Sequence, residues 1–538
     1  MSTGVCVIVI GYDDVRHVGD AVRSALDQGA AVTEVIAVDD ASGDGTGAVL
    51  DELAVREPRL RVLHRDVNSG GCGTPRNDGL RAATAPYVMF LDSDDVLPPG
   101  AVRALLDAAQ RHGSQVTAGA CVRRELPDGG ETRWQRALYV RETVHAIPEE
   151  RPRLVRDTLC VNKLYDLAFL RQHAITFPEG AFRYEDFPFT ARVLAAAPRI
   201  ALIPDTVYVW NVRRRAAALS LSLDRGVDNW LGRLAAHRAA VQVLQEAGSG
   251  RLAHAARVKF LDHDLRLYLR ELPEHGPAHR RTWWHAARAH LAEYAERDLR
   301  AARAPARWLS HVVLASPEPP QDPAELHRLA QLASRPARLL PPYATDADGR
   351  PVWSAALPQA VLDRLGRQAR QGLPVAVDGV WTAGPLGRDT LRLRVHEIYG
   401  QLAAAGAHRL DVELRQRATG RAGQLRSVPL HPMDGGWAAT VPLDLATLAA
   451  QRPGGAAEPV GVWDVWVTVR CADGRAFRTT VRPVGPPLRR RVVPVGRQLV
   501  LLVQPYRTSG DDLALRLAPG LRGAAHLTAG RLRRLGGV

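Results

Sequence analysis

Short apolar runs alternate with helix-like spacings over residues 1–225. The runs Val5–Ile10, Val35–Val38 and Tyr87–Leu91 are continuous, as in parallel strands that are buried on both faces. Between the first two runs, apolar residues recur from Val15 to Leu26 with a helical spacing. A strand and a helix about every 30 residues predict a mostly parallel sheet covered by helices.

The pattern changes twice further along the chain. From about residue 226 to 335 the strand signal disappears and apolar residues recur at helical spacing. Beyond about residue 375 the spacing becomes two, as in Leu391, Leu393 and Val395, which is typical of β-sandwiches. We therefore expect an α/β domain at 1–225, a helical connector at 226–335, and a β-rich region at 336–538 with one or two immunoglobulin-like sandwiches.

Composition and charge exclude some classes of protein. With 46% hydrophobic and 24% charged residues the chain is globular and not disordered. The net charge is +14, but residues 1–95 hold 8 Arg, no Lys and 16 acidic residues, a net charge of −8. A domain that reads nucleic acid usually concentrates positive charge on its recognition element, so we expect no nucleic-acid partner.

The sequence also bears on the compartment. No apolar run approaches the roughly 18–20 residues that a membrane helix needs, and the first residues lack the pattern of a signal peptide. The five cysteines are far apart and form no CxxC pair, which is typical of free thiols in a reducing compartment. We expect a cytoplasmic protein without a transmembrane segment, and peripheral association with the inner face of the membrane stays open.

Carboxylates gather where each predicted strand ends. The three strands run into Gly11-Tyr12-Asp13-Asp14, Asp39-Asp40-Ala-Ser42 and Asp92-Ser93-Asp94-Asp95. Because ligands bind beyond the carboxyl ends of parallel strands, we expect these loops to form one site. Helix capping explains one Asp or Ser per loop, but not a pair or triple in each. Mg²⁺ or Mn²⁺, held by one or two carboxylates and by substrate phosphates, would relieve their mutual repulsion.

A glycine-rich segment lies between the second and third of these strands. It reads Asn68-Ser-Gly70-Gly71-Cys-Gly73-Thr-Pro-Arg76-Asn77-Asp-Gly79. Glycines allow the backbone to approach a ligand closely, and the planar guanidinium of Arg76 would suit a phosphate or a sugar hydroxyl. The alternative is a surface loop that ends at a helix N-terminus.

The order of these segments resembles that of the family 2 inverting glycosyltransferases. That family has Val-Asp-Asp-x-Ser-x-Asp-x-Thr, Asn-x-Gly, Arg-Asn-x-Gly and Asp-x-Asp-Asp in this order, and this chain matches it over roughly its first 95 residues. The resemblance implies an α/β GT-A (Rossmann-like) catalytic domain that moves one sugar from a UDP-sugar donor to a hydroxyl acceptor. The chain departs from the family at Asp13, where Asn is frequent, and at Ile10, where Pro is frequent.

The resemblance also implies roles for individual residues on the donor side. Tyr12 and Asp40 would hold the uracil or ribose, with Asp39 in support. Asp92 would contact the ribose or the sugar, and Asp94 would ligate the Mn²⁺ or Mg²⁺ that bridges the diphosphate. The remaining candidates for donor binding are Asp13, Asn68, Arg76, Ser93, Lys163, Arg213 and Arg215.

A second carboxylate pair would act on the acceptor. Glu185-Asp186 resembles the family's element before a helix, with Asp186 as the base that deprotonates the acceptor hydroxyl and Glu185 in support or touching the donor sugar. The alternative is an ordinary capped helix. Lys163 stands out because the chain has only two lysines, and Arg213 to Arg215 resemble a basic segment that covers the diphosphate. A solvated charge run is the alternative for these arginines.

The whole layout is similar to that of the β-glycosyltransferases that decorate wall teichoic acid. It implies a cell-surface polymer, such as teichoic acid or another polysaccharide, as the acceptor, and a homo-oligomer formed through the C-terminal β-region. The net charge of +22 on the remaining 443 residues would suit an anionic polymer. The alternatives are a GT-A scaffold that binds nucleotide-sugar or polymer without chemistry, and a related nucleotidyltransferase. A nucleotidyltransferase usually has a Gly-rich loop with Lys after its first strand, where this chain is acidic.

Overall fold

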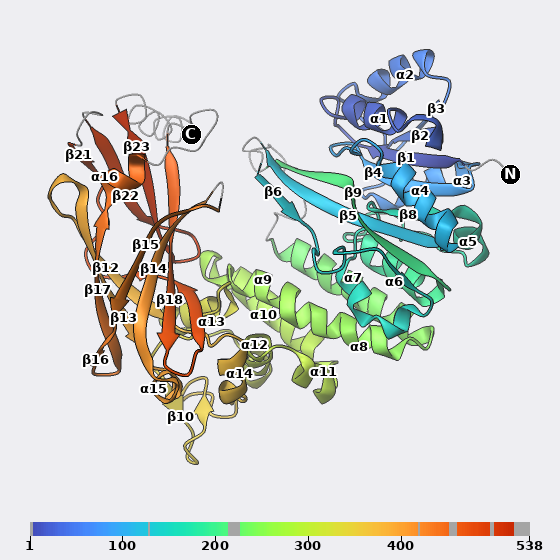
Figure 1. The fold of residues 1–538 in the computed structure, drawn as a ribbon. Helices are drawn as coiled ribbons and strands as arrows, with labels where there is room; N and C mark the ends of the chain where they lie inside the picture. The colour runs from blue at the N-terminus through green and yellow to red at the C-terminus, as the bar shows by residue number, and fades with distance from the viewer. Residues whose placement is uncertain are drawn as a thin grey trace. The chain divides into compact units, whose positions relative to one another are not determined.

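The chain forms two compact units. The computed structural model describes residues 4–126, 130–213, 226–417, 420–450, 460–494 and 500–520. One unit comprises Met1–Phe260 with Tyr294–Asp298, and the other comprises Leu261–Glu293 with Leu299–Val538 (Figure 1). The helices that follow the α/β domain are thus divided between the two units.

The first unit is built around a nine-stranded sheet. Its order is β3-β2-β1-β4-β8-β5-β9-β7, with β6 paired to β5. The four strands from β3 to β4 are parallel, and β8 is antiparallel to both of its neighbours. The strands are β1 (Val5–Gly11), β2 (Val32–Asp39), β3 (Leu60–His64), β4 (Tyr87–Asp92), β5 (Val116–Leu126), β6 (Gly130–Arg133), β7 (Thr143–His145), β8 (Lys163–Asp166) and β9 (Ile200–Arg213).

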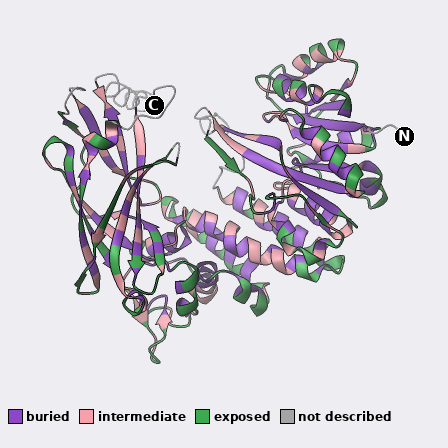
Figure 2. Ribbon diagram, in the orientation of Figure 1, coloured by how far each residue is buried: buried purple, intermediate pink, exposed green. Residues whose placement is uncertain are grey.

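The three predicted apolar strands are β1, β2 and β4. Every residue of β1 is buried, and Figure 2 shows the centre of the sheet as buried. In the parallel register Ile10 lies opposite Asp92 and Gly11 lies opposite Asp39. The loops that follow the three strands therefore leave the sheet at a common level, which confirms the predicted α/β architecture and the predicted convergence of the strand ends.

Helices cover this sheet, and one of them requires a glycine at its contact. A Cβ on Gly79 of α3 would lie 2.3 Å from the side chain of Ile8 in β1, so only glycine allows this close packing. The helices of the first unit are α1 (Val18–Leu26), α2 (Thr46–Arg56), α3 (Gly73–Ala82), α4 (Ala101–His112), α5 (Leu167–Gln172), α6 (Asp186–Ala196), α7 (Val227–Glu246) and α8 (Gly250–Lys259).

The second unit begins with helices. Trp283 and Trp284 of α10 (Pro277–Ala292) are fully buried, so they pack the helices together. Among the described residues, none of the helices combines the length and the apolar character needed to cross a membrane. The helices here are α9 (Arg266–Leu269), α10 (Pro277–Ala292), α12 (Ala304–Ala315), α13 (Pro323–Ala333), α14 (Leu365–Gln371), α15 (Gln401–Ala405) and α16 (Leu445–Ala450), and α11 (Glu296–Ala301) is shared with the first unit.

A β-sandwich completes the second unit. Its sheets are ordered β16-β17-β13-β12-β20 and β15-β14-β18-β23-β22-β21, with β19 paired to β18. Along β13 and β18 buried apolar residues alternate with residues that are more exposed, which confirms the predicted period of two. The strands β10 (Ala344–Thr345) and β11 (Pro351–Val352) form a separate two-stranded sheet. The strands of the sandwich are β12 (Val377–Thr382), β13 (Arg388–His396), β14 (Ala407–Gln416), β15 (Ala422–Pro429), β16 (His431–Met433), β17 (Gly436–Asp444), β18 (Gly461–Cys471), β19 (Ala476–Thr480), β20 (Arg482–Pro483), β21 (Arg491–Val493), β22 (Leu501–Arg507) and β23 (Leu513–Pro519).

Candidate active site

The loops after β1 and β2 are tied to each other. The backbone N–H of Asp13 donates to Ser42 Oγ at 3.0 Å, and Asp13 Oδ1 accepts from the N–H of Gly43 at 2.8 Å. Asp13 and Ala41 have φ angles of 46° and 62°, a left-handed region that such residues seldom adopt. The hydrogen bonds hold both residues in this strained conformation. Tyr12 stands at the edge of the two loops with 52% of its surface exposed.

Asp40 organises the segment that follows β3. Its carboxylate accepts from Ser69 Oγ at 2.7 Å and from Asn68 Nδ2 at 3.1 Å, and it lies 2.8 Å from Arg65 Nε. Asp39 is also buried and accepts from the backbone N–H of Ser42 at 3.1 Å. The structure therefore brings Asp39, Asp40 and Asn68 together, and it fixes the carboxylate of Asp40 within the protein.

The turn after β4 is fastened to β9. The buried carboxylate of Asp95 accepts from Tyr208 Oη at 2.8 Å and from the backbone N–H of Asn211 at 2.7 Å. Arg213 Nη1 donates to the Asp94 carbonyl at 2.9 Å and lies 3.1 Å from Asp94 Oδ2. The Asp94 side chain remains 47% exposed. Asp95 is thus a structural anchor, and Asp94 is the carboxylate of this turn that solvent reaches.

The surroundings of Asp94 favour a cation. Desolvation and the neighbouring carboxylates of Asp92 and Asp14 together raise the pKa of Asp94 to about 6, and Arg213 opposes this rise. Ser93 Oγ donates to Asp14 at 2.7 Å, so this hydroxyl is engaged with the first loop. Within the described part of the chain, no three His, Cys, Asp or Glu side chains form a metal-binding group. The protein therefore offers single carboxylates here and not a complete ligand cage.

Arg76 joins the two halves of the predicted site. It lies in α3, is 2% exposed, and has its guanidinium 5.3 Å from the centre of the Phe177 ring. Arg76 Nη2 lies 2.7 Å from Asp92 Oδ1. Arg76 Nη1 lies 3.3 Å from Asp186 Oδ1 and also contacts Glu185 Oε1. One buried cation thus faces three carboxylates that come from two distant parts of the chain.

Glu185 and Asp186 form a carboxylate pair where α6 begins. Tyr184, just before them, has a φ angle of 61°, so the backbone that presents the pair is strained. Burial raises the pKa of Glu185 to about 7, and it also raises the pKa of Asp186, while Arg76 lowers both. The Cys160 thiol hydrogen-bonds to Asp186. The Asp186 side chain is 19% exposed against 10% for Glu185, so Asp186 is the more accessible member.

The glycine-rich segment packs against protein. A Cβ on Gly73 would lie 1.9 Å from the Pro178 carbonyl oxygen, and one on Gly71 would lie 2.6 Å from the Gly180 carbonyl oxygen. Asn77 both donates to and accepts from the backbone of Phe177, at 3.0 and 2.9 Å. The glycines at 71 and 73 are therefore explained by the close approach of residues 177–182, the segment that leads to the carboxylate pair. The sequence alone predicts a ligand as the partner in this close approach.

Lys163 is held inside the protein. Its ammonium is 3.1 Å from Asp157 Oδ2 and 3.0 Å from Asn162 Oδ1, and it also donates to the Leu159 carbonyl. Tyr139 Oη also donates to the buried carboxylate of Asp157. Lys163 is therefore a counter-ion in a buried network, and its predicted contact with the donor stays a prediction.

The structure thus assembles most of the predicted residues. Asp92, Arg76, Glu185 and Asp186 are in direct contact, and Arg213 contacts Asp94. Arg215 lies outside the described residues. The structural roles of Asp157 and Asp95 were not predicted from the sequence. The available signals were the rarity of Lys, for Asp157, and a third carboxylate in the same turn, for Asp95.

Known protein families and proteins resemble the first part of this chain. The family described as Glycosyl transferase family 2 matches residues 6–176. The succinoglycan biosynthesis protein ExoO of Rhizobium meliloti is 29% identical over 41% of this chain and 64% of its own length. The poly(ribitol-phosphate) beta-glucosyltransferase of Bacillus spizizenii is 30% identical over 35% of this chain and 29% of its own length. The chain therefore spans less than two thirds of the length of either relative.

A solved structure extends the likeness in fold to nearly the whole chain. The crystal structure of Staphylococcus aureus TarS covers 96% of this chain and 85% of its own, with a TM-score of 0.51 and 18% identity. A TarS 1–349 structure in complex with UDP-GlcNAc covers 66% of this chain, with a TM-score of 0.50 and 20% identity. In fold, this chain shares with TarS an α/β domain, helices and a C-terminal antiparallel β-region. The first unit of this chain carries a glycosyl transferase family 2 domain.

Proposed function

We propose that this chain is an inverting glycosyltransferase that moves one sugar from a UDP-sugar to a hydroxyl of an acceptor. The acceptor in this proposal is a cell-surface polymer, such as a teichoic acid or another polysaccharide. The observation that carries the proposal is the position of Arg76, which holds Asp92 of the donor side and the Glu185–Asp186 pair on one guanidinium. The name of the Bacillus relative, a poly(ribitol-phosphate) beta-glucosyltransferase, and the UDP-GlcNAc bound to TarS support it.

Inversion needs one base on the side opposite the leaving group. Asp186 would accept the proton of the acceptor hydroxyl while that oxygen bonds to the anomeric carbon and the bond from this carbon to UDP breaks. A base works best when its pKa lies near the working pH. Burial raises the pKa of Asp186 in this direction, and it raises the pKa of its neighbour Glu185 to about 7. Arg76 and the Cys160 thiol would hold the carboxylate of Asp186 in place.

The donor would lie over the ends of β1, β2 and β4. Tyr12 is the half-exposed aromatic side chain of this surface, and its ring suits the face of the uracil. Asn68 donates a hydrogen bond to the Asp40 carboxylate, and the two residues shape the adjoining loop. Asp13 and Ser93 lie in the first and third loops and would complete the donor contacts.

A divalent cation fits the chemistry of the site. The pKa of Asp94 is raised by burial and by neighbouring carboxylates, which a cation would counteract. Mg²⁺ and Mn²⁺ accept one or two protein carboxylates when substrate phosphates supply further oxygens. Such an ion would neutralise the charge that develops on the departing diphosphate. Asp94 is the residue that we propose as its ligand, with Arg213 beside it as a second positive charge on the phosphates.

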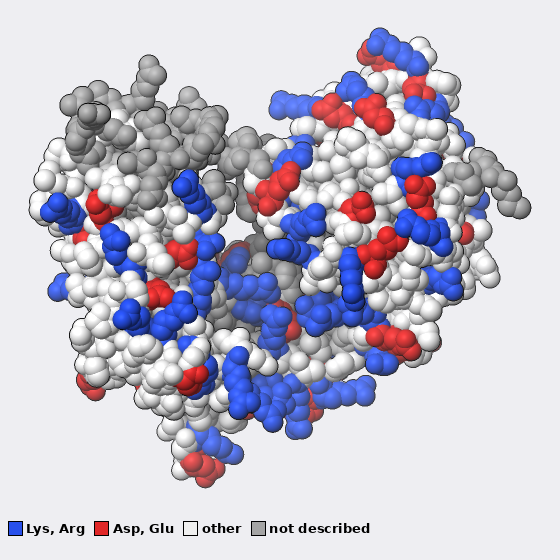
Figure 3. All heavy atoms as spheres, in the orientation of Figure 1, with Lys and Arg blue, Asp and Glu red and all other residues white. Residues whose placement is uncertain are grey.

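The second unit bears on the acceptor and on assembly. We propose that arginine side chains outside the acidic first loops attract an anionic polymer, and that the β-sandwich joins copies of the chain. Figure 3 shows basic and acidic side chains interspersed over the visible face of the first unit. On that face an anionic polymer would therefore be attracted by individual basic side chains and not by one continuous positive surface.

A UDP-release screen tests the proposal. The purified chain is given UDP-GlcNAc, UDP-glucose and UDP-galactose with Mn²⁺, each with poly(ribitol phosphate), poly(glycerol phosphate) or a neutral glucan. The proposal predicts acceptor-dependent UDP release with at least one pair. Retained binding of UDP-sugar without release from any pair would favour a scaffold that binds without chemistry.

A further inference from the structure

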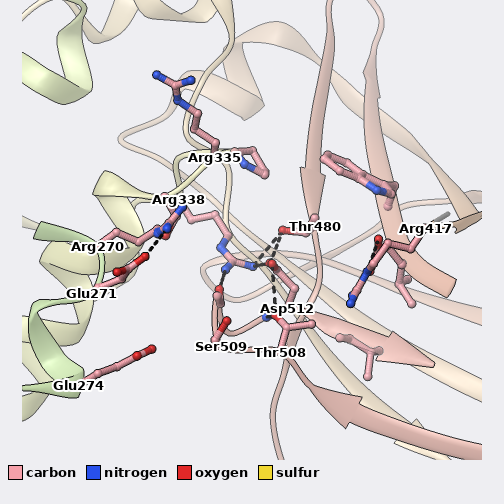
Figure 4. Close-up of a pocket in the computed structure, with 17 residues that line it drawn as sticks. Arg270, Glu271, Glu274, Arg335, Arg338, Arg417, Thr480, Thr508, Ser509 and Asp512 are labelled. Atoms are coloured by element: carbon pink, nitrogen blue, oxygen red, sulfur yellow. Dashed lines mark hydrogen bonds and ion pairs between the residues drawn. The ribbon is translucent and has the colours of Figure 1, made fainter. Parts of the chain in front are cut away.

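A polar pocket in the second unit is a candidate for a second ligand site. Its volume is about 390 Å³, within the range of about 300–1,000 Å³ typical of small-ligand sites. Figure 4 shows residues of the helical part, among them Glu274, on one side of the pocket and Arg417 on the strand side. All residues that line it belong to this one unit.

A fixed guanidinium forms the floor of this pocket. Arg338 is 1% exposed, and its Nε donates to Gln331 Oε1 at 2.8 Å. Its two terminal nitrogens bond to the Gly510 carbonyl at 2.8 Å and to Thr480 Oγ1 at 3.1 Å, and Nη1 lies 2.9 Å from Asp512 Oδ1. The floor is therefore preorganised, and a ligand would meet groups that are already held in place.

The walls present arginine–carboxylate pairs. On the helical side Arg270 pairs with Glu271, and on the strand side both Nε and Nη2 of Arg417 face the carboxylate of Asp464. These four side chains are between 22% and 47% exposed, so a ligand in the pocket can reach them. Each pair places hydrogen-bond donors directly beside acceptors.

The balance of positive and negative charge in the pocket indicates which kind of ligand it can bind. Four arginines and four carboxylates line the pocket, so its formal charge is zero. A phosphodiester accepts hydrogen bonds but donates none, and its negative charge would be repelled by the carboxylates. A hydroxyl group both donates and accepts, so it can bond to a carboxylate and to the adjacent guanidinium at the same time. The pocket thus matches neighbouring hydroxyl groups better than it matches a polyanion.

Further side chains that line the pocket also favour a ligand rich in hydroxyl groups. The hydroxyls of Thr508 and Ser509 line the pocket beside Asp512. The ring of Trp466 lines it as well and offers an apolar surface for the C–H groups of a sugar. Arg478 packs on this ring with its guanidinium carbon 4.6 Å from the ring centre, which fixes the ring's position.

We infer that this pocket is a binding site for a neutral, hydroxyl-rich saccharide or polyol unit, distinct from the site of sugar transfer. Such a site would hold part of a long glycan while another part of it reacts. That the bound saccharide is part of the acceptor rests on the proposed function, whereas the binding of a saccharide in this pocket does not. The Asp186→Asn variant should therefore bind saccharide in this pocket as the wild type does.

The test measures binding of defined probes to the full chain. Maltotriose, N-acetylchitotriose and ribitol serve as neutral probes, and inorganic phosphate and glycerol 3-phosphate serve as anionic ones. Titration calorimetry and saturation-transfer NMR should detect at least one neutral probe. Arg417→Gln or Asp464→Asn should weaken its binding about 10- to 100-fold, because each removes hydrogen bonds made by a charged group.

Matched variants make the outcome decisive. Arg470 lies on the same strand as Asp464 and pairs with Asp411 at 2.7 Å, but neither lines the pocket. Arg470→Gln should leave probe binding unchanged, and thermal unfolding checks that each variant folds. The inference is overturned if no neutral probe binds, if Arg417→Gln and Asp464→Asn bind as tightly as Arg470→Gln, or if phosphate binds more tightly than every neutral probe. Saccharide binding without transferase activity would reject the proposed function and keep this inference.

Discussion

Replacement of Arg76 by Gln should destabilise the first unit in a way that depends on pH. The substitution removes the guanidinium that contacts Asp92, Glu185 and Asp186 and so takes a shared counter-charge from their carboxylates. Removing one partner of a buried ion pair typically costs about 3–5 kcal/mol of folding free energy. At pH 8 we expect a loss of this size.

The sign of the pH dependence follows from the carboxyl groups. Arg76 lowers the pKa values of Glu185 and Asp186, so these values rise further in the folded variant. A carboxyl whose pKa is higher in the folded than in the unfolded chain weakens folding at pH values above its unfolded pKa, which is about 4. As the pH falls from 8 toward 5, the pair takes up protons, and the destabilisation should become smaller.

Urea denaturation of the wild type and the variant at pH 8 and pH 5 measures this effect. Arg81→Gln is the matched control, because Arg81 lies on the same helix and pairs with Glu179 at 3.3 Å, but is 60% exposed. An exposed pair contributes about 0–1 kcal/mol, so the control should change little at either pH. An Arg76→Gln loss below about 1 kcal/mol, or an equal loss at both pH values, would refute the reasoning about a shared buried cation.

Three further predictions concern the metal, the base and the buried network. Asp94→Asn should abolish sugar transfer while the thermal unfolding temperature is retained, and wild-type activity should disappear in excess EDTA and return with Mn²⁺; full activity in EDTA would contradict a metal role. The rate of transfer should rise as the pH increases from 5 to 8, because the raised pKa of Asp186 keeps the base protonated at lower pH and its neighbour Glu185 has a pKa of about 7; a rate that is flat from pH 5 to 8 would oppose this assignment. Asp157→Asn should destabilise the first unit by about 3–5 kcal/mol in urea denaturation, because it leaves the Lys163 ammonium buried without its counter-ion, and a loss below about 1 kcal/mol would argue against this network.

The sequence was informative where local patterns decide the structure. The continuous apolar runs at Val5–Ile10, Val35–Val38 and Tyr87–Leu91 become the parallel strands β1, β2 and β4, because strands buried on both faces need apolar residues throughout. The carboxylates after these strands meet because parallel strands end at a common edge. The period of two beyond residue 375 correctly predicted the β-region.

Contacts between distant segments could not be predicted in this way. Arg76 and Glu185 are 109 positions apart, and no local spacing indicates that they touch. The glycines at 71 and 73 suggested a ligand, but the sequence does not show that residues 177–182 pack against them. The pocket around Arg338 likewise combines a loop near residue 335 with strands beyond residue 410, so only the folded chain reveals it.

The central claim is that Asp186 is the base of a sugar transfer. The most direct measurement compares UDP release by the wild type and by Asp186→Asn, together with calorimetric binding of UDP, using the donor and acceptor that the screen identifies. Loss of a positioned base should lower the rate about 100- to 10,000-fold, while the affinity for UDP stays unchanged. Equal rates of release, or a variant that no longer binds UDP, would contradict the account.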